Sequence, residues 1–221
     1  MHAGSDTASG YRCEAATVAG FIQQLAVAYV AKGYWFYVTG KIPSNKSPEA
    51  VDQKIIERYG IRISKWARVR RRRRGAASVQ YLRRGHFFIL LATHGEHVFF
   101  EAEKRMLCDV RRIPIKFGGY SIAYREKGDA GNAIVRIERR CCLALRSFFL
   151  NIACEDFETI SAEFRALSFE PYAAVRRQLL GILGKVNQRR AKAGLEPIPR
   201  EVVRLRRKSV RCFVQEIGAE K

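Results

Sequence analysis

Apolar positions recur at steps of three and four along several segments of the chain, which is the period of an amphipathic helix. The pattern covers residues 14–32 and ends before Gly33, a typical helix stop. A second helix begins at Ser47-Pro48-Glu49, because serine caps a helix, proline fits its first turn and a carboxylate favours its positive end. The same pattern predicts helices at 47–59, 141–153, 157–167 and 172–192.

Short segments rich in apolar, aromatic and β-branched residues lie between these helices and predict strands. Residues 86–92 are almost continuously apolar, which is typical of a central strand. Gly118-Gly119 separates two further segments, as in a hairpin. The predicted strands are 34–39, 79–83, 86–92, 97–100, 113–117, 120–124 and 133–137. We therefore expect an α+β fold, with a mainly antiparallel sheet packed with helices on one side and a helical C-terminal part.

This pattern divides the chain into three parts. Residues 1–12 start with small and polar side chains and predict a flexible tail. Residues 13–155 contain the strands and form the predicted α+β basic domain, and residues 156–221 form a helical C-terminal extension packed on the same core. The strand-helix-strand-strand order in 34–92 fits a split βαβ arrangement, a fold that often exposes a sheet face to nucleic acid.

Charge adds a partner class to this picture. The chain has 41 basic and 21 acidic residues, a formal net charge of +20. The net charge is +1 over residues 1–60, +13 over 61–140 and +6 over 141–221. This uneven distribution indicates a localised basic surface, and nucleic acid is the commonest polyanion that such a surface binds.

The densest basic segment contains six arginines in seven residues: Arg68, Arg70, Arg71, Arg72, Arg73 and Arg74. Arginine binds phosphate through two parallel hydrogen bonds and stacks on bases. Trp66 and Tyr81 flank the run and offer further stacking faces. The sequence therefore predicts a nucleic-acid-binding protein, without choosing between DNA and RNA, in which these arginines bind phosphates.

The local structure of the run has two interpretations. Ser64 could cap a short helix that carries Trp66 and the arginines, with Gly75 as its stop. Repulsion among the arginines equally favours an extended loop.

A second basic cluster follows the last predicted helix and consists of Arg204, Arg206, Arg207, Lys208 and Arg211. We expect it to contribute to nucleic-acid binding less than the arginine run does. Two arginine pairs on the 172–192 helix, at 176–177 and 189–190, could extend the same surface. About thirteen positions separate the pairs, so they are offset around the helix axis.

An alternative function is a metal-dependent enzyme of mobile elements that nicks single-stranded DNA. His94 and His97 flank a tight turn and are its candidate metal ligands, and Tyr172 is its candidate catalytic nucleophile. In two-histidine nicking enzymes one residue separates the histidines, whereas two residues separate His94 from His97. A third hypothesis is a protein-assembly module whose basic face binds an acidic partner.

Other functional classes lack sequence support. The chain contains no phosphate-binding glycine loop and no serine-hydrolase elbow, and we expect no cofactor apart from the divalent metal of the nicking hypothesis. The six cysteines form no CxxC pair and the chain start lacks the basic segment of a signal peptide, so we expect buried reduced thiols and a cytoplasmic location. No apolar stretch reaches 18 residues, which predicts no membrane-spanning helix.

Overall fold

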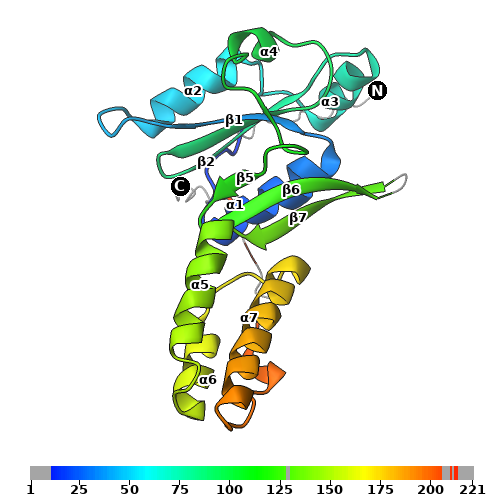
Figure 1. Ribbon diagram of the computed structural model, residues 1–221. Helices are drawn as coiled ribbons and strands as arrows, with labels where there is room; N and C mark the ends of the chain where they lie inside the picture. Colours follow the sequence, from blue (N-terminus) through cyan, green and yellow to red (C-terminus); the bar gives the residue numbers. More distant parts are fainter. Residues whose placement is uncertain (1–10, 128–129, 206–209, 211, 214–221) are drawn as a thin grey trace, which may run out of the picture. The chain divides into compact units, whose positions relative to one another are not determined.

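A computed structural model describes residues 11–127, 130–205, 210, 212 and 213 (Figure 1). The α+β prediction is confirmed, because the described chain contains two antiparallel sheets, seven α-helices and a helical C-terminal part. The chain forms two compact units. Unit 1 extends to Val110 and includes residues 210, 212 and 213, and unit 2 begins at Arg111. The predicted domain boundary lay instead between residues 155 and 156.

Unit 1 contains a four-stranded sheet of order β2-β3-β1-β4 in which all neighbours are antiparallel. Strands β1 and β2 therefore run in the same direction on either side of β3, which is the split βαβ arrangement. Its elements are α1 (Val18–Gln23), the π-helical turn η1 (Gln24–Tyr29), the 3-10 turn η2 (Val30–Lys32), β1 (Phe36–Lys41), α2 (Pro48–Arg58), α3 (Lys65–Arg73), β2 (Val79–Arg84), β3 (Phe87–Ala92), α4 (Val98–Ala102) and β4 (Cys108–Asp109).

Helices cover both faces of this sheet, not the single face that we expected. On one face Leu90 and Ala92 of β3 pack with residues of α2 and α4. On the other face the ring of Phe87 meets Phe21 of α1, with ring centroids 5.9 Å apart. Figure 1 shows α1 and α2 on opposite sides of the sheet. Burial on both faces explains the continuous apolar run of β3.

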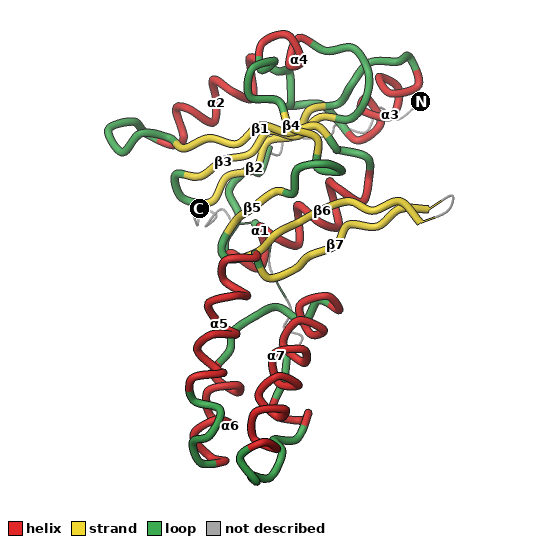
Figure 2. The backbone as a smooth tube through the Cα atoms, viewed as in Figure 1, coloured by secondary structure: helices red, strands yellow, loops and turns green. Residues whose placement is uncertain are grey.

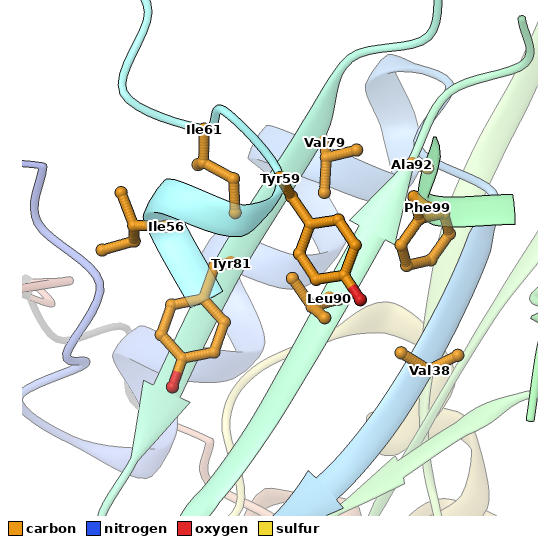
Figure 3. Packing of buried hydrophobic residues seen from close by; sticks show 9 residues of the cluster. All are labelled: Val38, Ile56, Tyr59, Ile61, Val79, Tyr81, Leu90, Ala92 and Phe99. Carbon is orange, nitrogen blue, oxygen red and sulfur yellow. The ribbon is translucent and has the colours of Figure 1, made fainter. Parts of the chain in front are cut away.

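The core beneath α2 gathers apolar side chains from the sheet, from α2 and the segment that follows it, and from α4 (Figure 3). Burial of each large apolar side chain contributes about 1.5–3 kcal/mol, so this cluster holds α2 and α4 on the sheet. Its buried members are Val38, Ile56, Tyr59, Ile61, Val79, Tyr81, Leu90, Ala92 and Phe99.

The strand predicted at 97–100 is wrong, because this segment starts helix α4. His97 caps the helix by accepting a hydrogen bond at Nδ1 from the backbone N–H of Phe99, at 3.0 Å. The turn buries Phe99 completely against Tyr59. An apolar run of three residues has no resolvable period, so the sequence pattern did not separate a helix from a strand here.

The N-terminal segment covers the edge of β2, and residues 212 and 213 pair with that segment. Tyr11, predicted to lie in the tail, bonds the backbone of Tyr81 through its hydroxyl, at 2.8 and 2.9 Å. The backbone of Ala15 bonds Arg83 of β2, and that of Ala16 bonds Cys212. This pairing covers backbone groups that an edge strand would otherwise expose. Residues 1–10 of the predicted tail lie outside the described chain.

Unit 2 contains a three-stranded antiparallel sheet of order β5-β6-β7, followed by helices. The predicted glycine hairpin is confirmed, since Gly118 and Gly119 turn the chain between β5 and β6 with positive φ. The side-chain amide of Gln178 bonds both backbone groups of Ile137 and ties α7 to β7. The elements are β5 (Ile115–Phe117), β6 (Tyr120–Lys127), β7 (Ala130–Ile137), α5 (Arg139–Asn151), α6 (Phe157–Ala166), α7 (Ala173–Lys192) and the 3-10 turn η3 (Arg200–Val202).

All six cysteines are free thiols. Five are half-buried and Cys154 is exposed, so they are less buried than we expected. Within the ranges that the structure describes, no helix has the length and apolar character needed to cross a bilayer.

Candidate nucleic-acid interface

The arginine run forms helix α3 (Figure 2), which decides between the helical and extended interpretations. Ser64 caps the helix: its Oγ accepts a hydrogen bond from the backbone N–H of Ala67, at 3.2 Å. The cap satisfies a backbone donor that has no partner within the first turn.

The C-terminal end of α3 is closed by a Schellman motif. Gly75 has φ +80°, its N–H bonds the carbonyl of Arg72, and the N–H of Ala76 bonds the carbonyl of Arg71, each at 3.1 Å. Four arginines occupy the last turn. Cations are favourable at the negative end of a helix, which offsets part of their mutual repulsion.

The loop between β3 and α4 holds this end of α3 in place. The backbone of Glu96 accepts from Ala77 and donates to Gly75, both at 3.0 Å. A Cβ atom at Gly95 would lie 2.5 Å from the carbonyl oxygen of Gly75, so only glycine permits this close approach. The turn that we considered as a metal site thus positions the arginine helix.

Arg68 is the inward-facing arginine of the run. Its side chain is half-buried near Tyr11 and Tyr29. Burial raises the pKa of both tyrosines, and the positive charge of Arg68 acts in the opposite direction. Arg68 therefore belongs to the packing between α3 and the N-terminal segment, although we predicted that it binds phosphate.

The side chain of Arg71 lies near the C-terminal end of α2. Its guanidinium comes within 4.0 Å of the position that a Cβ at Gly60 would take, and it lines a hollow of about 210 Å³ with Glu57 and Arg62. The pKa of His97 is lowered, first by burial and then by the charge of Arg71. Arg71 thus has neighbours inside unit 1 as well as an exposed surface.

The other four arginines of the run are exposed to solvent, and no carboxylate among the described residues pairs with them. With Lys65, Arg68 and Arg71 they bring seven positive charges and no negative charge to residues 64–74. A helix surface of this kind has a strongly positive potential that attracts polyanions. These four are Arg70, Arg72, Arg73 and Arg74.

Trp66 shares the outward face of α3. It is 71% exposed, and Arg70 and Arg73 follow it four and seven positions later. Residues at this spacing lie on one helix face. Tyr81, in contrast, is completely buried and cannot stack on a ligand. Of the two aromatic residues that we expected to stack, only Trp66 is accessible.

The second basic cluster is described only at Arg204, which is exposed and donates from Nε to the carbonyl of Glu201 at 3.1 Å. The remaining predicted residues of this cluster lie outside the described chain: Arg206, Arg207, Lys208 and Arg211.

Helix α7 presents part of the basic surface that we expected. Arg176, Arg177 and Arg189 are exposed. Arg190 is buried and donates to the carbonyls of Ala153, Glu155 and Glu196 at 2.7–3.1 Å. It therefore joins α7 to the end of α5 and does not face a ligand.

The residues of the nicking hypothesis lie in different units. His94 and His97 belong to unit 1, where Nδ1 of His97 caps α4 and the ring of His94 lies 6.5 Å from that of Phe36. Tyr172 is half-buried and directly precedes α7 in unit 2. In the described ranges, no three or more His, Cys, Asp or Glu side chains are grouped as metal ligands.

The structure also contains a buried ionic cluster that sequence analysis missed. The side chain of Arg83 is 3% exposed, and its Nε donates to both oxygens of Asp52 at 3.0 and 2.9 Å. Glu14 accepts two more hydrogen bonds from the same guanidinium. Asp52 also accepts from Tyr81 and Cys13. Arg83 is the next-to-last residue of β2 and precedes Arg84, and no local sequence pattern distinguishes the buried arginine from its neighbour.

Comparison with models of known protein families gives no match, and comparison with curated proteins gives none either. The interface is therefore interpreted from its own charges and geometry.

Proposed function

We propose that this protein binds nucleic acid, DNA or RNA, through the outward face of α3. The observation that carries the proposal is a row of exposed arginines with no carboxylate partner among the described residues, on a helix fixed at both ends. Phosphates would neutralise these charges and release the counterions around the nucleic acid, which favours binding.

The charge of the whole chain supports the same partner class. Unit 1 has 20 basic and 11 acidic residues, and unit 2 has 21 and 10. Both units are therefore basic, and α3 contains the densest cluster. The exposed side chains of α7 form a second, more widely spaced basic surface that would contribute less.

The structure defines which arginines a binding test should change. A variant with Arg70, Arg72, Arg73 and Arg74 changed to Gln removes the outward charges and leaves Arg68 and Arg71 in their packed positions. Binding to single- and double-stranded DNA and RNA is then measured over a series of salt concentrations. Each lost phosphate contact lowers the slope of log K against log salt by about 0.9 on duplex and about 0.7 on single strands, so the slope falls by up to about 3 to 4 units on duplex.

A matched control removes four exposed charges from α7 by changing Arg176, Arg177, Lys185 and Arg189 to Gln. It has the same net charge as the α3 variant, so it separates a local site from general attraction. The proposal requires that the α3 variant lose much more nucleic-acid affinity than the α7 variant. Equal losses of affinity would show that the overall charge of the protein, and not α3, attracts the polyanion. Weak binding by the wild type, together with tight binding to an acidic protein, would favour the protein-assembly hypothesis.

A further inference from the structure

We infer that Trp66 stacks on an unpaired base, so that α3 prefers single-stranded nucleic acid to duplex. This inference rests on the nucleic-acid binding proposed above and names the substrate class of the same face. The large aromatic ring lies among unpaired guanidinium groups on one solvent-facing stripe of the helix. Trp66, Arg70 and Arg73 form that stripe.

Trp66 is not part of the protein core. The smaller apolar residues of α3, Ala67 and Val69, are half-buried, whereas Trp66 is 71% exposed. An indole ring carries the largest apolar surface of any side chain, and leaving it in water forgoes the stabilisation that burial would supply. A stacked base would cover this surface, and the surrounding guanidinium groups would bind the adjacent phosphates.

The geometry of nucleic acid then selects the strand type. In a duplex the base faces are stacked on one another, and a side chain reaches only the base edges and the backbone. In a single strand the faces are accessible, and stacking on an aromatic ring tolerates any base. Side chains four positions apart on a helix have their Cβ atoms about 5–6 Å apart. The indole and the guanidinium of Arg70 can therefore contact the base and phosphate of one nucleotide.

A lipid surface fits this face less well. A helix that lies on a membrane inserts a broad apolar face below a basic one. On α3 the outward face offers one large apolar side chain, and the small apolar residues are turned toward the protein. Charge complementarity to phosphates combined with one isolated aromatic ring therefore favours a single strand over a bilayer.

The test compares the wild type with Trp66→Ala and Trp66→Phe. The ligands are a 20-nucleotide single strand of thymidine, a blunt duplex of the same length, and vesicles that contain phosphatidylserine. We expect Trp66→Ala to weaken single-strand binding by roughly 5- to 150-fold, the loss that removal of one stacked base gives. Duplex binding should change by less than about 2-fold, and the salt slope should stay the same because no charge is removed.

Trp66→Phe keeps an aromatic face and should restore part of the single-strand affinity. Fluorescence provides a direct reading, since stacking quenches indole emission. The chain has two tryptophans, and Trp35 remains in every variant as an internal reference. The wild type should be quenched by the single strand, and this quenching should disappear in Trp66→Phe.

The outcomes distinguish this inference from the proposal on which it rests. If single-strand binding collapses in the four-arginine variant but is unchanged in Trp66→Ala, α3 binds phosphates and stacking is refuted. Equal losses of duplex and single-strand affinity in Trp66→Ala would also refute it. If the wild type shows no salt-dependent binding to the single strand or to the duplex, the proposed function and this inference both fail. Tight vesicle binding that is lost in Trp66→Ala would assign the face to lipid.

Discussion

At the scale of single residues, burial determines which charged groups stabilise the fold and which remain available. Arg83 and the arginines of α3 are the same residue type, yet Arg83 is almost completely buried and meets Asp52 and Glu14. A buried cation requires partners because desolvation is costly. The exposed arginines of α3 remain hydrated, so they need no carboxylate in the folded protein.

Loss of the Asp52 carboxylate should therefore destabilise unit 1 strongly. Asp52→Ala leaves Arg83 and the hydroxyl of Tyr81 with fewer buried acceptors, and breaking a buried pair costs about 3–5 kcal/mol. Urea unfolding of the purified variant measures this loss. Glu49→Gln is the control, because Glu49 is exposed and lies 3.7 Å from the same guanidinium. It should lower the midpoint far less, since it loses only an exposed ion pair and a favourable charge in the first turn of α2. Similar midpoints for both variants would contradict the structural role of Asp52.

Cys13 should make stability sensitive to alkaline pH. Burial, and then the neighbouring charge of Asp52, raises the pKa of this thiol to about 12. The unfolded chain loses the same proton near pH 8.5. The stabilisation that the protonated thiol gives to the folded state is therefore complete below that pH and disappears as the pH rises toward 12. Burial raises the pKa of Cys212 as well.

The variant Cys13→Ala/Cys212→Ala tests this effect. Unfolding midpoints are measured in urea between about pH 7.5 and 9, where unfolded thiols ionise but few unfolded tyrosines do. We expect the wild-type midpoint to decline over this interval and the variant midpoint to stay level. A parallel decline in both proteins would assign the pH dependence to other groups.

At the scale of elements, the position of α3 depends on a close backbone contact at Gly95. Gly95→Ala would place a methyl group 2.5 Å from the carbonyl oxygen of Gly75, at φ +131°. We expect a loss of at least about 2 kcal/mol in the free energy of unfolding, from strain and displaced backbone. Gly85→Ala is the matched control, since its φ is also positive but no atom lies within 4 Å. It should cost only about 1 kcal/mol.

Helix α7 contains two exposed glycines whose replacement should have the opposite effect. A Cβ atom at Gly181 or Gly184 would meet no neighbour. Alanine loses less backbone entropy in a helix, so each single substitution should stabilise the protein by about 0.5–1 kcal/mol. Thermal or urea unfolding of Gly181→Ala and Gly184→Ala measures the gain. A loss of stability would show that something covers this helix face.

The elements that the sequence predicted well have strong local signals. Ser47 and Pro48 begin α2 with cap chemistry, and the long α7 has a clear apolar period. For α3 the same kind of signal, Ser64 and Gly75, left a helix and an extended loop open, and the structure shows the helix. The division of the strands into two sheets depends on non-local pairing, which local patterns do not encode. For a related reason, the sequence did not show which arginines of α3 are packed and which are exposed. Apart from Trp66, the only apolar residues of α3 are Ala67 and Val69, so no apolar stripe indicates which face packs.

At the scale of the whole molecule, a net charge of +20 works against compactness. Screening by salt weakens repulsion between exposed charges, whereas the buried Arg83 cluster is less affected. We therefore expect the thermal midpoint to rise as sodium chloride increases from about 0.02 to 0.2 M. Differential scanning fluorimetry follows this change.

The variant with Arg70, Arg72, Arg73 and Arg74 changed to Gln should show a smaller rise, since it removes a large share of the repulsion. A single-stranded oligonucleotide should raise the wild-type midpoint further at constant salt, because a ligand that binds only the folded state stabilises it. An equal salt response in both proteins would place the dominant repulsion outside α3.

The discontinuity of unit 1 has a consequence for the order in which the chain acquires its structure during synthesis. Residues 111–205 follow one another without interruption in unit 2, but residues 212 and 213 return to pair with Ala15 and Ala16. A ribosome delivers the arginine helix and the β2 strand long before it delivers these residues. The backbone pairing beside β2 therefore stays incomplete during most of translation, and it closes only after all of unit 2 has been made.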